Sequence, residues 1–247
     1  MMIEERSKLP ESMGDLFSTA LRAYGRRLPL YLGVALLALV VQTALSAAFP
    51  TDRGILIAAQ IVCEALIASL VTIGVVGDVH IAATRPGNGA VFDAALQRWW
   101  IVSGASLGIG VVDFFALGQI FAPGQDALDY FLILPLAVFS GSLNFAPAIA
   151  ALDVKTRPEL LVFSSIGRSF SLSLLRANLG RIVVLSFVAL IPTLLETVLS
   201  DVLHVRNIRG STFLGAVPID TLVTGPMQAI FTLFYLDFVR RAAAATP

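Results

Sequence analysis

Six apolar segments, each about 20 residues or longer, limit what this chain can fold into. A helix needs about 20 apolar residues to cross a hydrocarbon core of roughly 30 Å. The segments that reach this length lie at 28–49, 54–79, 101–122, 130–152, 181–203 and 213–239. Hydrophobic residues make up 57% of the chain and charged residues only 14%, which departs strongly from a soluble domain. The sequence therefore predicts an all-α, polytopic membrane protein with six transmembrane helices.

An eight-residue pattern precedes every second apolar segment. Each copy begins with Phe, ends with an aromatic residue and carries Arg or Gln at its sixth position. The three copies lie at 17–24, 92–99 and 163–170. A repeat of this kind defines an architecture rather than an activity. It predicts that one membrane domain, 1–247, is built from three units at about 12–84, 87–153 and 156–241.

Each copy has the periodicity of an amphipathic helix. In the first copy, Phe17, Ala20 and Tyr24 share one face, and Arg22 lies on the opposite face. Such a helix lies in the membrane interface, with aromatic residues at the acyl boundary and arginines near lipid phosphates. Each unit would then be an interfacial helix followed by two spans. The alternative is that each copy is a cytoplasmic extension of the span that follows it.

Helix start signals stand before all three copies. Ser12 with Asp15 and Thr156 with Glu159 form loose capping-box patterns, and Asn88 is a favourable N-cap residue. We expect the three helices to begin at these positions.

Lysine and arginine residues are divided unevenly between the two sides of the predicted spans. One side holds three of the seventeen, namely Arg53, Arg206 and Arg209. The other side holds the remaining fourteen, including those in all three copies. Because basic residues accumulate in cytoplasmic loops, this distribution predicts that both termini are cytoplasmic and that the three copies lie at the cytoplasmic leaflet.

Four acidic residues lie at similar depth inside the predicted spans. They are Glu64, Asp113, Glu196 and Asp220. Ionisable side chains are costly in a membrane and are functional candidates there. If the four converge on a cavity open to the outside, they would bind a cation, protons or an amine-bearing substrate. The alternative is that each is protonated or hydrogen-bonded to a neighbour such as Gln60, since burial disfavours the charged form.

Two further spans carry polar or small residues. Asn144, together with Ser140 and Ser142, makes the fourth segment locally polar near Pro147. This pattern indicates either close helix packing or part of a substrate path. Gly104-x-x-x-Gly108 in the third segment is a small-residue packing motif.

Patterns typical of catalysis or metal binding do not occur. The single cysteine, Cys63, lies within an apolar segment, and His80 and His204 lie on opposite sides of the predicted membrane. The sequence has no nucleophile elbow, His-Glu-x-x-His pattern, phosphate-binding loop or dinucleotide fingerprint. We therefore predict no metal, no cofactor, no nucleic-acid partner and no enzymatic activity.

Four short segments carry a family resemblance. They are Pro86–Ala90, Phe145–Ile149, Ile166–Phe170 and Phe234–Arg241. Together they resemble a broad group of bacterial six-span membrane proteins of unknown function, which includes the membrane domain found next to glycerophosphodiester phosphodiesterases. The resemblance implies a helical module of the bacterial inner membrane near lipid or envelope functions. It supplies no catalytic residues, because the phosphodiesterase barrel is absent from this chain.

Three functions follow, in descending order. The first is a non-enzymatic module that organises membrane lipids or a partner membrane protein at the cytoplasmic leaflet. Its expected contact residues are Phe17, Arg22, Phe92, Trp99, Phe163 and Arg168. The second is a small transporter or permeation protein that uses the embedded acids. The third is an intramembrane, lipid-related enzyme, for which no nucleophile and base are identifiable.

Overall fold

The structure, a computed structural model, confirms the predicted all-α class. It describes residues 10, 12–49, 52–80, 85–117, 135, 138–139, 141–153, 156–189 and 211–245. Only the backbone is described at residues 53, 80, 112–117, 158–159, 211–221 and 245. Every regular element within these ranges is a helix.

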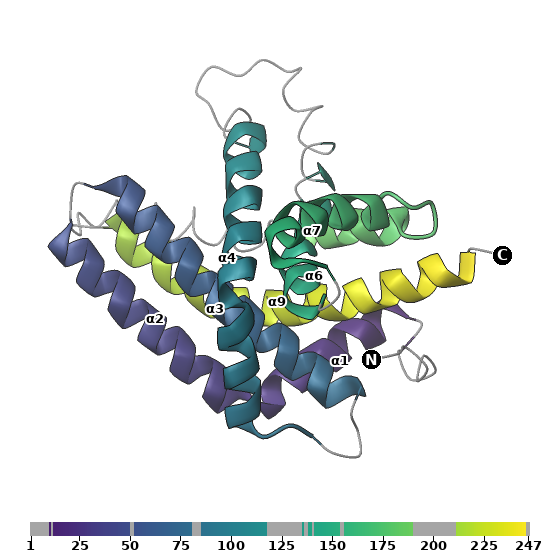
Figure 1. Cartoon of the computed structure of the whole chain (residues 1–247), viewed down its shortest axis with the longest axis horizontal. Coiled ribbons are helices and arrows are strands. Elements are labelled where there is room, and N and C mark those ends of the chain that lie inside the picture. Colours follow the sequence, from purple (N-terminus) through teal and green to yellow (C-terminus); the bar gives the residue numbers. More distant parts are fainter. Residues whose placement is uncertain are drawn as a thin grey trace.

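The helices form one packed bundle with a crossing element. The helices α1 (Met13–Arg26) and α2 (Leu28–Ala48) are joined by Arg27 alone. They are followed by α3 (Arg53–His80), α4 (Asn88–Leu117), α6 (Ala146–Leu152), α7 (Pro158–Ser173), a further helix at Leu179–Ala189 and α9 (Ser211–Ala245). Figure 1 shows α2 and α3 alongside one another, with α4 crossing α3.

Within the part of the chain that the structure describes, three helices are long and apolar enough to cross a membrane, which indicates a multi-pass membrane protein. Leu28–Ala48 and Gly54–Val79 match the first and second predicted spans, and Leu222–Ala244 overlaps the sixth. The other three predicted spans lie partly outside the described residues. A shorter apolar helical stretch at Gly141–Leu152 falls within the fourth span, and another at Leu179–Ala189 overlaps the beginning of the fifth.

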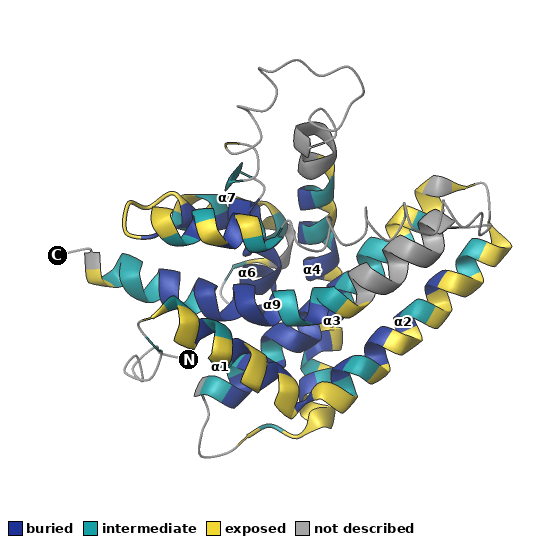
Figure 2. Ribbon diagram, turned by 180° about the vertical axis from the view of Figure 1, so that it is seen from behind, coloured by how far each residue is buried: buried dark blue, intermediate teal, exposed yellow. Residues whose placement is uncertain are grey.

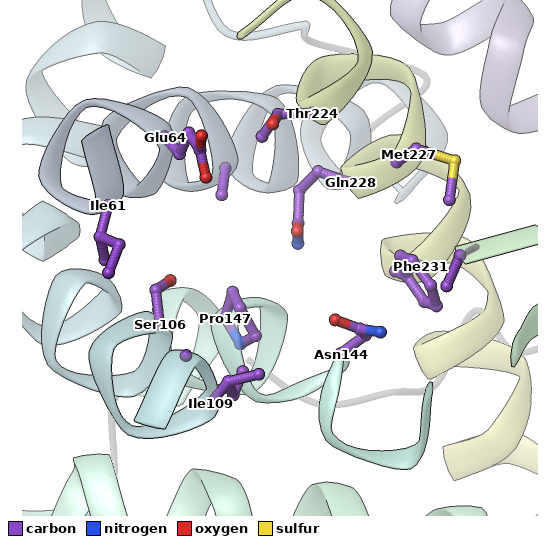
Figure 3. A pocket seen from close by; sticks show the side chains of 13 residues that line it. Ile61, Glu64, Ser106, Ile109, Asn144, Pro147, Thr224, Met227, Gln228 and Phe231 are labelled. Atoms are coloured by element: carbon purple, nitrogen blue, oxygen red, sulfur yellow. The ribbon is translucent and has the colours of Figure 1, made fainter. Parts of the chain in front are cut away.

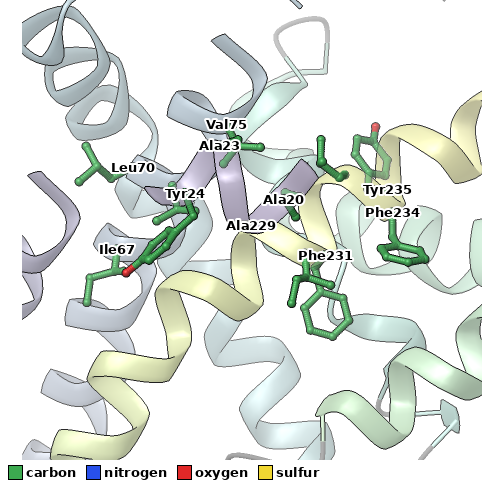
Figure 4. Close-up of a cluster of buried hydrophobic side chains, with 14 of the residues drawn as sticks. Ala20, Ala23, Tyr24, Ile67, Leu70, Val75, Ala229, Phe231, Phe234 and Tyr235 are labelled. Carbon is green, nitrogen blue, oxygen red and sulfur yellow. The ribbon is translucent and has the colours of Figure 1, made fainter. Parts of the chain in front are cut away.

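The first copy of the repeated pattern forms α1, as predicted. Ser12 caps this helix, because its Oγ accepts a hydrogen bond from the Asp15 backbone N–H at 3.1 Å and donates to the Asp15 carboxylate at 2.6 Å. The apolar face of α1 is buried at Leu16, Ala20 and Tyr24. That face packs on α9 and α3 rather than projecting outwards (Figure 4).

The second copy differs from the interfacial-helix prediction. It lies within α4, which continues from Asn88 to Leu117 as one helix. The second copy is therefore continuous with the helix that contains the beginning of the third predicted span, as the alternative expected. The expected N-cap at Asn88 is also wrong: Asn88 is the first helical residue, and its Oδ1 accepts a hydrogen bond from Arg27 Nη1 at 2.8 Å.

The third copy forms α7, which is separated by a turn from the helix Leu179–Ala189. The expected cap at Thr156 is wrong, because α7 begins at Pro158 with Arg157 as its N-cap residue. The Thr156 hydroxyl instead donates to the Asp153 carboxylate at 2.8 Å, in the loop before the helix. Proline suits this first helical position because it needs no backbone donor there.

Two clusters of buried apolar side chains form the core. The larger one joins α1, α2, α3 and α9 to the first turns of α4, to α6 and to the helix Leu179–Ala189, and the smaller one joins α3, α4, α6 and α7 (Figure 2). The Gly104 and Gly108 motif packs within the chain: a Cβ atom on Gly104 would lie 2.9 Å from Val162 Cγ2, and one on Gly108 would lie 2.7 Å from Ile166 Cδ1. These glycines let α7 approach α4 closely.

Candidate functional site

A cavity of about 290 Å³, lined by both polar and apolar side chains, lies between the helices (Figure 3). Its lining comes from α3, α4, α6, α9, the helix Leu179–Ala189 and the residue Asn144. The lining residues are Ile61, Glu64, Ala68, Ser106, Ile109, Gly110, Asn144, Pro147, Ala189, Thr224, Met227, Gln228 and Phe231. This volume is close to the lower limit for small-molecule sites.

Glu64 is the predicted embedded acid that the structure places in this lining. It is half-buried on α3 and accepts a hydrogen bond from Gln60 Nε2, one helical turn earlier, at 2.9 Å. Gln60 was among the hydrogen-bond partners expected from the sequence. The carboxylate is thereby oriented while it still lines the cavity.

Asn144 reaches the cavity because the backbone changes direction at this residue. Residues 144–145 form a turn between the helical residues 141–143 and α6, with Pro147 in the first turn of α6. The Asn144 backbone N–H donates to the Gly141 carbonyl at 3.3 Å, which closes the turn. The locally polar stretch predicted in the fourth segment therefore contributes to the cavity wall (Figure 3).

Gln228 is a cavity residue that no sequence pattern indicated. Its side chain is 6% exposed, and its Nε2 donates to Thr72 Oγ1 at 2.9 Å. Thr72 Oγ1 lies 3.1 Å from Thr232 Oγ1, and Thr232 donates to the Gln228 carbonyl at 2.7 Å. This buried network ties α3 to α9 and fixes the Gln228 amide, which points into the cavity (Figure 3).

The three other embedded acids are not placed relative to Glu64. Asp113 and Asp220 lie on described helical backbone, in α4 and α9, without described side chains. Glu196 lies outside the described residues. Convergence of the four acids on one site therefore stays a prediction.

The six residues expected to contact lipid or a partner occupy different environments. Phe17 and Phe92 are partly buried and pack against the larger core cluster. Trp99 is half-buried, whereas Arg22 is exposed and donates to the Ser18 carbonyl on its own helix at 3.2 Å. In α7, by contrast, Phe163 is 79% exposed.

Arg168, the last of these six, is also exposed and forms an ion pair with Asp153. It therefore lies at the surface of the same helix as Phe163. The third copy is the one whose aromatic and basic residues both remain accessible.

A buried ion pair at the α1–α2 junction was not predicted. The Arg27 guanidinium donates to the Asp78 carboxylate at 2.7 and 3.1 Å, and to the Pro86 carbonyl at 2.8 Å. Together with the bond to Asn88, these contacts join α2, the end of α3 and the start of α4. The hydrogen bonds to Asp78 raise the pKa of Arg27, against the lowering effect of burial. This guanidinium stays charged.

Comparison with known proteins gave no match to a family model, to a curated protein or to a solved structure. The resemblance to membrane domains that accompany phosphodiesterases therefore stays a prediction.

Proposed function

We propose that this membrane protein binds, and allows the passage of, a small cationic or hydrogen-bond-donating solute through the cavity at Glu64. The observation that carries this proposal is the joint lining of one cavity by a carboxylate and two carboxamides. Glu64 on α3, Asn144 in the turn before α6 and Gln228 on α9 come from three separate segments, and all three have oxygen acceptors.

The charge of the described lining favours a cation. Glu64 is its one ionisable residue, and no lysine, arginine or histidine is among the described residues that line it. A carboxylate in a low-dielectric environment attracts positive charge more strongly than it would in water. Ser106 and Thr224 add hydroxyl groups, while Met227 and Phe231 supply apolar surface for a methyl or methylene group.

Flux of a permanently charged probe tests the proposal. Tetramethylammonium cannot cross as a neutral base, so its uptake into proteoliposomes under an inside-negative potential reports passage of the cation. We expect uptake by the wild-type protein and a loss of at least about tenfold in Glu64→Gln, which retains the size and removes the charge.

The control variant is Asp93→Asn, which makes the same chemical change on α4, away from the cavity lining. It should leave uptake within about twofold of the wild-type rate. Absence of uptake in the wild-type protein, or equal uptake by Glu64→Gln, would contradict the proposal.

Contact with lipid or a partner membrane protein at the cytoplasmic leaflet is the second candidate function. The exposure of Phe163, at 79%, and of Leu160, at 61%, favours α7 as the contacting helix. Charge reversal at Arg168 should reduce co-purifying lipid or protein, as measured by mass spectrometry. Charge reversal at Arg22 should have the smaller effect, because the apolar face of α1 is covered. If both variants and the wild type retain equal amounts of lipid and protein, that result would argue against this function.

A further inference from the structure

The hydrogen bonds around Thr72 fix which way round the Gln228 carboxamide lies. Thr232 donates its hydroxyl proton to the Gln228 backbone carbonyl at 2.7 Å, and a hydroxyl has a single proton to give. Thr72, whose Oγ1 lies 3.1 Å from Thr232 Oγ1, is therefore the donor in that contact. The Thr72 oxygen is then left as an acceptor, so the group that lies 2.9 Å from it on Gln228 is the amide nitrogen, Nε2.

The carbonyl oxygen of the same amide, Gln228 Oε1, consequently faces away from Thr72. It accepts no hydrogen bond from the residues that the structure describes, although Gln228 is only 6% exposed. Because Gln228 lines the cavity, this acceptor can meet a ligand there (Figure 3). Thr72 and Thr232 are not among the described lining residues. They are positioning residues, since they act on a ligand only through the amide that they hold.

Two oxygen acceptors from different helices therefore face the same solute. The Glu64 carboxylate comes from α3, and Gln228 Oε1 comes from α9. A cation with N–H groups on separate nitrogen atoms can donate to both, and guanidinium–carboxylate hydrogen bonds are among the strong ones in proteins. A fully alkylated cation presents only methyl groups, so it leaves the Gln228 oxygen without a partner. An unsatisfied buried acceptor weakens binding.

We propose that the cavity at Glu64 selects small cations with several N–H donors, such as a guanidinium ion, over fully alkylated cations. Thr72 and Thr232 set this selectivity by holding Gln228 Oε1 towards the solute. This inference rests on the proposed function, because it concerns the same cavity and adds the class of solute and the residues that determine it. The selectivity then depends on the buried contact between α3 and α9 as well as on the cavity lining.

Equilibrium binding of two permanently charged cations tests the selectivity. Isothermal titration calorimetry of the full-length protein in detergent gives the Kd of guanidinium, which has N–H donors, and of tetramethylammonium, which has none. The wild-type protein should bind guanidinium at least about tenfold more tightly, since a hydrogen bond to a charged group is worth about that factor. The difference in size between the two ions is the same for every variant. A change in the ratio of the two Kd values therefore reports the hydrogen bonds.

Variants at Thr72 separate the effect of its hydroxyl from the packing around it. Thr72→Val keeps the shape of the side chain, removes the hydroxyl and should reduce the preference for guanidinium about three- to tenfold. Thr72→Ser keeps the hydroxyl and should retain the preference to within about twofold. A variant that was merely destabilised would instead change both Kd values together.

The matched control is Ser69→Ala, which removes another fully buried hydroxyl group of α3. The Ser69 hydroxyl donates to the Ala95 carbonyl at 3.1 Å, and Ser69 is not among the described residues that line the cavity. This variant should leave the preference for guanidinium within about twofold of the wild-type value.

The outcomes distinguish this inference from the solute proposal. Equal Kd values for the two cations in the wild-type protein, or an unchanged ratio in Thr72→Val, would overturn the inference and leave the solute proposal standing. Binding of neither cation would overturn both. A preference for guanidinium that falls in Thr72→Val, without uptake of tetramethylammonium into proteoliposomes, would support the selectivity and contradict passage through the cavity.

Discussion

The first and third copies of the repeated pattern form similar helices in different surroundings. Leu16 in α1 is fully buried, and the Phe17 ring lies 5.1 Å from the Phe234 ring, measured between centroids. In α7, Phe163, which aligns with Phe17, is 79% exposed, whereas Ile166 and Phe170 of the same copy pack against the smaller core cluster. The first aromatic residue of the pattern is therefore covered by protein in one unit and exposed in the other.

The arginines of the two regions differ in burial in the same way. Arg27, just after α1, forms a buried pair with Asp78, whereas Arg168, within α7, is an exposed arginine that pairs with the largely buried Asp153. Amphipathic periodicity identifies which face of a helix is apolar but does not determine what covers it. In this chain α9 and α3 cover α1, whereas Leu160 and Phe163 on the outer face of α7 are exposed.

Separating the buried pair is expected to have the largest effect on stability. Arg27→Met leaves the Asp78 carboxylate buried without its partner, which costs about 3–5 kcal/mol. Arg168→Met, at the pair whose arginine is exposed, should cost about 1 kcal/mol or less, because Asp153 keeps its hydrogen bonds from Thr156. Denaturant unfolding in detergent, followed by circular dichroism, compares the two. Equal losses would show that the two pairs are equivalent despite their different burial.

Truncating the covered face of α1 should have the next largest effect. Leu16→Ala removes a side chain that is 0% exposed and should lower the free energy of unfolding by about 2–5 kcal/mol. Leu160→Ala on α7 makes the same change at an exposed position and should stay within about 0.5 kcal/mol of the wild type. A large loss in Leu160→Ala would indicate that a second copy or tightly bound lipid covers α7 in the purified protein.

The contact between α4 and the inner face of α7 should not tolerate a larger side chain at Gly104 on α4. Gly104→Ala places a Cβ atom 2.9 Å from Val162 Cγ2, and overpacking of this kind costs about 1–3 kcal/mol. The double variant Gly104→Ala/Val162→Ala should recover part of the loss by restoring space. If Gly104→Ala alone unfolds at the wild-type denaturant concentration, α4 and α7 do not pack in the manner described.

The outer face of α7 should accept the same methyl group. A Cβ atom added at Gly167 would meet nothing within 4 Å, so Gly167→Ala introduces no clash. Because alanine loses less backbone entropy than glycine on helix formation, this variant should gain about 0.5–1 kcal/mol. The same unfolding assay measures the gain, and a loss would show that a neighbour approaches this face in solution.

Much of the fold was predictable because its signals are local. Ser12 capped α1 as expected, and Leu16, Ala20 and Tyr24 formed its buried face. The missed helix starts have a common cause, since polar side chains suited to capping were used elsewhere. Asn88 accepts from Arg27, and Thr156 donates to Asp153.

The cavity was predictable only in part. Glu64 and Asn144 were conspicuous because charged and amide side chains are rare inside apolar segments. Ser106 and Thr224 carried no comparable signal, because small hydroxyl residues are common in packed membrane helices. Gln228 is an amide like Asn144, but no sequence pattern placed it beside Glu64. Which of these groups meet depends on contacts between distant segments, such as the Gln228–Thr72 hydrogen bond across 156 residues.

The Arg27 junction has a consequence for the order in which the protein assembles during synthesis. Its partners Asp78, Pro86 and Asn88 follow it by 51, 59 and 61 residues. At translation rates of about 5–20 residues per second, the ribosome adds the last of them roughly 3–12 s after Arg27. The nascent chain therefore carries α1 and α2 for several seconds with this arginine unpaired, and the angle between the two helices becomes fixed only after α3 has been made.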